Sequence, residues 1–367
     1  MVSDNTALLD DLFAQGAIIL DQGPLFGQAP PPLPADLAWD RVEGMMLGLA
    51  IGDALGNTTE GLLPHERRGL YGEIRDYLPN RYADGRPVGV PSDDTQMAFW
   101  TLEQLIADGG LNLDHLAQRF CAQRIFGIGS AVSRFVQAYQ SGTRPWHACA
   151  ADSAGNGALM RIAPVLIPHL RTGTPALWAD ATLAAILTHK QAASTSACVA
   201  WVSMLWSLLG MEQPPDPRWW IDAYCDVAHQ LEGDRALRLR GGSRRGFHGP
   251  LWRFVEEHVW DAYERGLSAL EAAAGWYSGA FVLESVSCAL YILMRHGDDP
   301  EEALVRAVND TKDSDTVGAI VGAAVGALHG TAALPRRWVD GLTGRTAADD
   351  DGRIATLLSQ ARAAFYA

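Results

Sequence analysis

Two short clusters of acidic and hydroxyl side chains could do chemistry together. Ser92-Asp93-Asp94-Thr95 follows Gly89-Val90-Pro91, and Asp313-Ser314-Asp315-Thr316 precedes a run of small apolar residues. Each cluster opens a segment with helical periodicity, where acidic residues also have an ordinary stabilising role in the first turn. Together, four carboxylates and several hydroxyls at two helix starts offer the all-oxygen coordination that Mg²⁺, Mn²⁺ or Ca²⁺ prefers. Zinc is disfavoured because neither cluster contains His or Cys.

Two glycine-flanked segments add further candidates. Gly52-Asp53-Ala54-Leu55-Gly56 is followed by Glu60, and Gly155-Asn156-Gly157 leads into Ala158-Leu159-Met160-Arg161. Glycines on both sides of Asn156 let backbone N–H groups approach a ligand, although Gly-Asn-Gly alone has the composition of an ordinary turn. The combination of these segments, rather than any single one, is specific.

The elements that must position these residues are helices. From Asp40 onward, apolar residues recur mostly at helical spacing, and strand-like alternation is rare. The spacing predicts clear helices over residues 97–106, 177–188, 197–209 and 281–294, the first ending at Gly109-Gly110 and the last near Gly297. We therefore expect an all-α protein.

Glycines recur at every fourth residue in two of the expected helices. They are Gly44, Gly48, Gly52 and Gly56 in one segment and Gly318, Gly322, Gly326 and Gly330 in the other. A glycine inside a helix costs about 1 kcal/mol relative to alanine, so each stripe needs a compensating gain. Close backbone packing, against each other or against a neighbouring helix, would supply that gain. The striped helices also carry the acidic residues.

Residues 1–36 differ in composition from the rest, so we expect an N-terminal extension followed by one domain over residues 37–367. The extension combines a short amphipathic stretch with a stiff, proline-rich linker. Its notable residues are Leu8, Leu9, Leu12, Phe13, Gly23-Pro24 and Pro30-Pro31-Pro32-Leu33-Pro34. It is either an ordered or frayed terminal extension, or an arm that binds a basic cleft on a partner through Leu25, Phe26 and its acidic residues.

Bulk composition excludes several classes of partner. The net charge of -14 and the pI near 5.1 argue against nucleic acid, because no surplus of basic residues exists to displace counterions. A signal peptide begins with a positively charged region, whereas no Lys or Arg precedes Arg41 in this sequence. We therefore do not expect a signal peptide. The apolar run 317–333 contains four glycines and follows acidic residues closely, so we do not expect a membrane span. Five scattered cysteines suit a reducing compartment, and we expect a cytoplasmic protein.

The motifs form a recognisable series along the chain. The series is Gly-Asp-Ala-Leu-Gly with Glu60, Ser-Asp-Asp-Thr, Gly-Asn-Gly-Ala-Leu-Met-Arg, Thr188-His189, and Asp-x-Asp-Thr before a glycine-rich helix. This order closely resembles the ADP-ribosylglycohydrolase family over residues 40–338. The resemblance implies a compact orthogonal helical bundle with a binuclear Mg²⁺ or Mn²⁺ site at the bottom of an ADP-ribose cleft. It also implies hydrolysis of the N-glycosidic bond between ADP-ribose and a modified protein side chain.

The resemblance assigns roles by position. The implied metal ligands are Ser92, Asp93, Asp94, Asp313, Asp315 and Thr316. The implied catalytic residues are Glu60 and Asp94. The implied substrate contacts are Asp53, Gly155, Asn156, Gly157, Met160, His189, Phe281 and Lys312, with Phe281 stacking on adenine. Two divalent ions would hold the ribose hydroxyls and acidify a water near the anomeric carbon, while a carboxylate manages the proton.

Two positions depart from the family pattern. Thr311-Lys312 stands where many members have two glycines, so Lys312 could either contact a phosphate or crowd the metals. Gly127-Ile128-Gly129 stands where arginine-type members have Asp-Ile-Gly. Arginine-linked ADP-ribose is the leading substrate, while serine-linked and small-molecule conjugates stay open.

Two further hypotheses accompany the hydrolase. One is an immunity protein that caps the active site of an ADP-ribosyltransferase toxin with residues 1–36, with or without hydrolase activity. The extension and the basic, loop-like segment 235–253 motivate it, because the hydrolase core needs neither. The other is a family member that binds ADP-ribose without cleaving it, which the two departures from the family pattern motivate.

Overall fold

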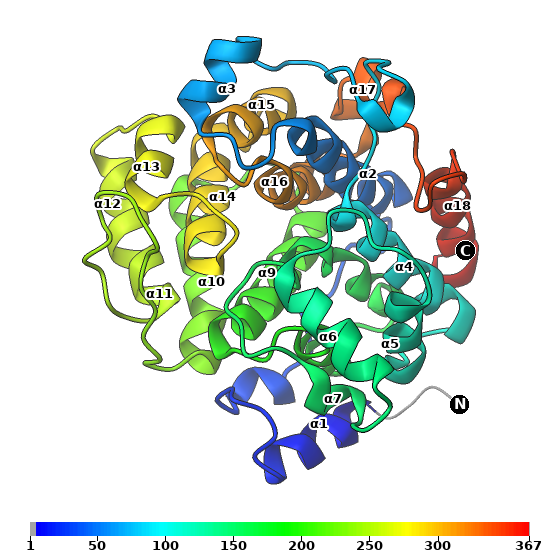
Figure 1. Cartoon of the computed structure of the whole chain (residues 1–367). Coiled ribbons are helices and arrows are strands. Elements are labelled where there is room, and N and C mark those ends of the chain that lie inside the picture. Colours follow the sequence, from blue (N-terminus) through cyan, green and yellow to red (C-terminus); the bar gives the residue numbers. More distant parts are fainter. Residues whose placement is uncertain (1–4, 367) are drawn as a thin grey trace.

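The computed structural model describes residues 5–366, and helices joined by loops make up the chain (Figure 1). Within this range there is no β-strand, and the β-type pairings are isolated bridges such as the one between Ala151 and His189. The all-α prediction is confirmed.

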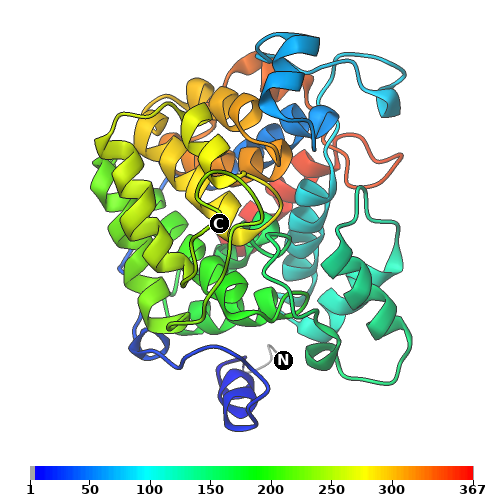
Figure 2. The same ribbon diagram turned by 60° about the vertical axis from the view of Figure 1, so that its left-hand side comes forward.

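The central helices carry or support the acidic clusters. They are α2 (Trp39–Gly56), α4 (Asp93–Asp108), α9 (Ala192–Gly210), α14 (Val282–His296), α15 (Pro300–Asp310) and α16 (Ser314–His329). Helix α16 contacts α2, α4, α9, α14 and α15, so it is the hub of the fold. Both views show α2 and α16 lying side by side (Figures 1 and 2).

The remaining helices surround this centre. Those near α4 are α5 (Leu113–Ala122), α6 (Ser130–Gln140), α7 (Trp146–Cys149) and α18 (Arg353–Phe365). Those near α14 are α10 (Pro217–Leu231), α11 (Leu251–Phe254), α12 (Trp260–Glu264) and α13 (Ala269–Trp276), with the π-helical turn η6 (Val255–Val259) joining α11 to α12. The others are α1 (Asn5–Ala14), α3 (Pro64–Tyr71), α8 (Ala176–Ile186) and α17 (Arg336–Gly341).

The four helices expected from the apolar spacing exist as α4, α8, α9 and α14. Helix α4 ends as expected, with Gly109 in the left-handed conformation at a φ of 72°. The starts of two helices lie earlier than expected, at Asp93 rather than Met97 and at Ala192 rather than Ala197. The first turns of these two helices consist of polar and small residues, so the spacing of apolar residues does not reveal them.

The two glycine stripes face each other along α2 and α16, and we call this contact the glycine seam. A Cβ atom added to Gly48 would lie 2.1 Å from the Gly322 carbonyl oxygen, and one added to Gly52 would lie 2.0 Å from that of Gly318. No side chain fits between the two backbones, so close packing accounts for the glycines. At the end of the seam, Gly56 rests directly on the first residues of α16.

The N-terminal extension packs onto the body of the protein over its described residues, while residues 1–4 lie outside them. Leu9 and Leu12 of α1 are buried. The Trp178 indole donates to the Gln28 carbonyl at 2.7 Å, and the Trp206 indole donates to the Pro31 carbonyl at 2.7 Å. Two tryptophans of α8 and α9 thus fix the proline-rich linker in place.

One helix in the described part of the chain, α9, is long and apolar enough to cross a membrane. In its most apolar window, 89% of the residues are buried inside the protein, as expected of a core helix. The apolar run over residues 317–333 forms most of α16, which is also buried.

Candidate metal and ADP-ribose site

Six carboxylates from different elements gather at the end of the glycine seam. This acidic cluster consists of Asp53, Glu60, Asp93, Asp94, Asp313 and Asp315. Carboxylate oxygens of Asp53, Asp94 and Asp315 lie within 4.8 Å of one another, and so do those of Glu60, Asp313 and Asp315. Asp315 belongs to both triads, so the two form one continuous arrangement of oxygen ligands.

Asp53 joins the end of α2 to the start of α4. Its carboxylate accepts hydrogen bonds from the Ser92 hydroxyl at 2.7 Å and the Thr95 hydroxyl at 2.6 Å, and from the backbone N–H groups of the same two residues. The sequence placed Asp53 among the substrate contacts, whereas the structure brings it together with Asp94 and Asp315. The seam explains this position, because it carries the end of α2 up to the start of α16.

Asp94 offers the clearest test of whether the cluster suits a cation. Its Oδ1 atom is buried and has no hydrogen-bond partner among the described residues. Its Oδ2 atom accepts a 3.3 Å hydrogen bond from Ser92 Oγ. A buried carboxylate oxygen without a partner is costly, and a divalent ion held by oxygen ligands would remove that cost. The donor set around Asp94 therefore fits a hard cation.

The electrostatics of the cluster point the same way. Burial, followed by the charge of neighbouring carboxylates, raises the pKa values of Asp93, Asp94 and Asp315 well above their usual range. Burial raises the pKa of Asp313 to about 7 against the opposing hydrogen bond from Asn156. Carboxylates forced together in this way must bind protons or cations, and cations displace the protons.

Asn156 links the Gly-Asn-Gly loop to the cluster. Its Nδ2 donates to Asp313 Oδ2 at 2.5 Å and to Ser285 Oγ at 2.8 Å. Helix α14 is tied to the same loop, since the Val282 N–H donates to the Ala154 carbonyl at 2.9 Å. The amide of Asn156 therefore fixes the orientation of a candidate metal ligand.

The glycines beside Asn156 make room for His189. A Cβ atom on Gly155 would lie 3.3 Å from His189 Nε2, and one on Gly157 would lie 3.0 Å from His189 Cε1. Burial lowers the pKa of His189 to about 3, so the imidazole is neutral at physiological pH. Its Nδ1 lies 2.9 Å from the Thr188 hydroxyl. Met160, the other predicted contact in this region, is buried.

Phe281 caps α14, and the basic segment 235–253 contributes a neighbour that the sequence did not identify. The guanidinium carbon of Arg240 lies 5.3 Å from the centre of the Phe281 ring. Arg240 also forms a 2.8 Å ion pair with the buried carboxylate of Glu284. The signal for this placement is the Gly-Gly pair after Arg240, since a Cβ atom on Gly241 would lie 2.5 Å from the Tyr277 ring.

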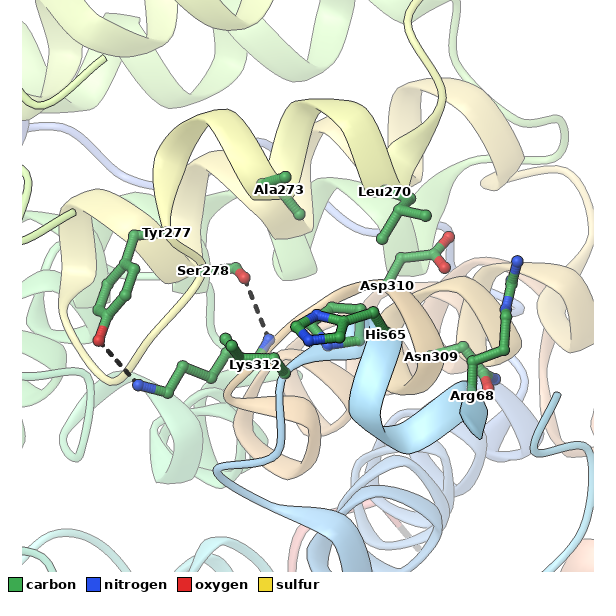
Figure 3. Close-up of a pocket in the computed structure, with 12 residues that line it drawn as sticks. His65, Arg68, Leu270, Ala273, Tyr277, Ser278, Asn309, Asp310 and Lys312 are labelled. Carbon is green, nitrogen blue, oxygen red and sulfur yellow. Dashed lines mark hydrogen bonds between the residues drawn. The ribbon is translucent and has the colours of Figure 1, made fainter. Parts of the chain in front are cut away.

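Lys312 lies between the cluster and a separate cavity. Its Nζ donates to the Tyr277 hydroxyl at 2.8 Å and its backbone N–H donates to Ser278 Oγ at 3.1 Å (Figure 3). Its carbonyl accepts a 3.2 Å hydrogen bond from the Gly61 N–H, next to Glu60. The cavity has a volume of about 510 Å³ and lies among α3, α13 and α15. The side chain of Lys312 is therefore directed to Tyr277 on the cavity wall.

Gly127, the second departure from the family pattern, lies against the cluster. Its φ is 63°, in the left-handed region, and an added Cβ atom would lie 3.2 Å from Asp93 Oδ1. An aspartate at this position would place another carboxylate beside Asp93. This chain lacks that acid at a point of direct contact with a candidate ligand.

The fold and the site define an all-helical protein with an acidic cluster beside a Gly-Asn-Gly loop. The model of the ADP-ribosylglycohydrolase family matches residues 33–364, and this chain belongs to that family. The family resemblance expected from the motifs is confirmed, and the chain is an ADP-ribosyl hydrolase by family.

Named relatives and a solved structure agree with this assignment. The chain is 26% identical to the ADP-ribosyl-[dinitrogen reductase] glycohydrolase of Rhodospirillum rubrum, over 88% of this chain and 97% of that protein. It is 25% identical to the ADP-ribosylarginine hydrolase Tri1 of Pseudomonas putida, over 84% and 76%. A solved ADP-ribosylglycohydrolase-related protein complex contains a chain with 27% identity and a TM-score of 0.65, with coverage of 89% and 97%.

Proposed function

We propose that this chain is a metal-dependent hydrolase that releases ADP-ribose from arginine side chains of modified proteins, using two Mg²⁺ or Mn²⁺ ions. The observation that carries the proposal is the pair of carboxylate triads sharing Asp315, together with the unpartnered Oδ1 of Asp94. The names of the two relatives, one an ADP-ribosylarginine hydrolase and one acting on a modified protein, support the linkage and the substrate class. The composition supports a cytoplasmic location.

The predicted ligands would hold the ions from two sides. Asp93, Asp94 and Ser92 reach the site from the start of α4, and Asp313, Asp315 and Thr316 reach it from the start of α16. When bound, the ions would polarise the ribose hydroxyls and a water near the anomeric carbon. Asp53 belongs to the first triad and also holds Ser92 and Thr95 in place by accepting hydrogen bonds from their hydroxyls.

Glu60 is the group we assign to proton transfer. It is the one solvent-exposed member of the two carboxylate triads. Although the residue reaches the surface, its carboxyl group is partly enclosed, and this desolvation, followed by the charge of Asp53, raises its pKa. A carboxyl group with a raised pKa at the mouth of a site is suited to exchange a proton with a water or with the leaving nitrogen.

The substrate side of the site combines neutral groups with one arginine. The loop of Gly155, Asn156 and Gly157 presents backbone above the neutral ring of His189. Phe281 supplies the aromatic face proposed for adenine, and Arg240 places a positive charge beside it. A dianionic diphosphate entering an acidic protein would gain from this charge.

The experiment is release of ADP-ribose from a panel of conjugates, with Mg²⁺, Mn²⁺ or EDTA. The panel contains an arginine-linked protein, a serine-linked peptide and a small-molecule conjugate, and Asp315→Ala serves as the inactive control. We expect metal-dependent release that is fastest from the arginine-linked protein. Faster release from serine-linked substrate would overturn the linkage, and no release under any condition would overturn the hydrolase.

The toxin-capping hypothesis gains no specific observation. Leu9, Leu12 and Leu25 of the N-terminal extension are buried against the rest of the same chain. A capping arm would have to give up these contacts before it could enter another protein.

A further inference from the structure

Arg67 is a buried arginine of α3, which follows the Glu60 loop. It is the buried residue of this otherwise exposed helix, with 0% of its surface accessible. Arginine is among the residues least often buried completely. Its position inside the protein therefore needs a reason that the helix itself does not supply.

The guanidinium group of Arg67 connects two loops of the candidate site. On the Glu60 side it donates to Thr59 Oγ1 at 2.8 Å and to the carbonyls of Thr59 and Leu62 at 3.2 and 3.3 Å. Thr59 and Leu62 bracket Glu60 in the chain. Three contacts from one rigid side chain thus hold the loop that carries Glu60.

On the other side, the same group reaches the loop that carries Asp313. It donates to the carbonyls of Asn309 and Thr311 at 3.2 and 2.7 Å and to Ser314 Oγ at 3.0 Å. Ser314 extends these hydrogen bonds to the end of α2, because its hydroxyl donates to the Gly56 carbonyl at 3.1 Å. A planar guanidinium with five N–H donors can make such a set of contacts, and a lysine ammonium cannot.

Arg67 also supplies a fixed positive charge close to the acidic cluster. It forms no direct ion pair among the described residues, and its acceptors are carbonyls and hydroxyls. Burial lowers its pKa to about 10, while the charges of Asp315 and Asp310 raise it, so the group is protonated at neutral pH. The positive charge of Arg67 therefore lies close to Asp315 without occupying any of its oxygens.

We propose that Arg67 is a positioning residue that sets the spacing between Glu60 and the Asp313–Asp315 loop, and so couples proton transfer to metal binding. This inference rests on the proposed function for its kinetic consequence and on the contacts above for its structural one. A side chain that only supported the fold would change stability without changing metal affinity or the contribution of Glu60.

The test compares Arg67→Lys and Arg67→Met with the wild-type chain. Arg67→Lys keeps the charge and loses the geometry, and Arg67→Met loses both. Arg119→Lys is the control, because Arg119 is a partly buried arginine that pairs with Glu103 and stacks on Trp100. Titration calorimetry of the metal-free chain with Mn²⁺ measures affinity, and ADP-ribose release measures kcat and KM.

We expect Arg67→Lys to weaken Mn²⁺ binding by about 10-fold and to lower kcat by about 10- to 100-fold, the range seen for residues that orient metal ligands. KM should change little, and Arg119→Lys should leave the Mn²⁺ affinity at the wild-type value. Wild-type Mn²⁺ affinity and kcat in Arg67→Lys would overturn the proposal. If Arg67→Met does not fold, Arg67→Lys alone decides.

A double mutant separates positioning from general support. Glu60→Gln should lower kcat strongly in the wild-type chain and much less in the Arg67→Lys chain, because the loop of Glu60 is already displaced there. Additive effects would contradict the coupling. If the wild-type chain bound Mn²⁺ but released no ADP-ribose from any conjugate, the proposed function would fail, while the Mn²⁺ affinities would still decide whether Arg67 positions the loop.

Discussion

The glycine seam and the acidic cluster lie next to each other in the α2–α16 pair, but close packing stabilises the seam and charge repulsion destabilises the cluster. Along the seam, Gly48 and Gly322 bring two backbones into direct contact with no charge between them. At the end of the seam, Asp53, Asp94 and Asp315 place carboxylates within 4.8 Å of one another. The seam gains from close packing, whereas the cluster is strained by charge repulsion. The glycine seam holds the acidic cluster in position, which preorganises the cluster for cations.

The largest expected effect comes from removing a carboxylate of the acidic cluster. Asp94→Ala and Asp315→Ala should each lower ADP-ribose release by more than about 100-fold, the upper limit for residues that only orient ligands. The metal-free variants should melt no lower than the wild-type chain, because each substitution relieves repulsion. Activity assays and thermal denaturation in EDTA check both parts. Unchanged activity in either variant would refute the metal site.

The second largest effect comes from disrupting the close packing of the glycine seam. Gly48→Ala puts a methyl group 2.1 Å from the Gly322 carbonyl oxygen, so the helices must separate. We expect a loss of about 3 kcal/mol in the free energy of unfolding, the cost of overpacking a rigid contact. Gly69→Ala in α3 is the control, since nothing lies within 4 Å of its added Cβ atom. Equal stabilities of the two variants in urea denaturation would disprove the role of the seam.

A third prediction uses pH to distinguish the contribution of the acidic cluster to stability from that of the glycine seam. The pKa of Asp313 is about 7 in the folded chain, above its ordinary value of 3.8, so the folded state binds more protons between these values. The stability of the metal-free protein should therefore fall as pH rises through this window. Asp313→Asn should flatten the fall, and Gly48→Ala should keep it. Urea denaturation from pH 4 to 8 in EDTA measures these slopes; a slope that Asp313→Asn leaves unchanged would count against the account.

The smallest effect concerns a buried carboxyl group outside both regions. Glu232 accepts hydrogen bonds from the N–H groups of Leu251 and Trp252, and burial raises its pKa to about 8. Between pH 6 and pH 9 the wild-type chain should lose about 2 to 3 kcal/mol of stability that Glu232→Gln keeps, because folded Glu232 holds its proton up to a pKa of about 8 and the unfolded chain does not. Added Mn²⁺ should not alter this difference. A metal-dependent difference would show that the cluster is not the only acidic region that responds to cations.

Local sequence predicted the helices and the motifs, but not the contacts between distant residues. The helical class, the glycine packing and the two acidic helix starts could be read from spacing. The fixed position of the proline-rich linker could not, because Trp178 and Trp206 hold it from far along the chain. The role of Arg67 could not be predicted for the same reason, because its neighbours have the composition of an exposed helix and its partner Thr311 is 244 residues away.

The most direct test of the central claim is calorimetric titration of the metal-free chain with Mn²⁺, beside Asp94→Ala and Asp315→Ala. The account predicts saturable binding by the wild-type chain that each substitution weakens severely, with a gain in thermal stability that disappears in step. Absence of Mn²⁺ binding by the folded wild-type chain, or equal binding by all three proteins, would contradict the assignment of the acidic cluster as a metal site.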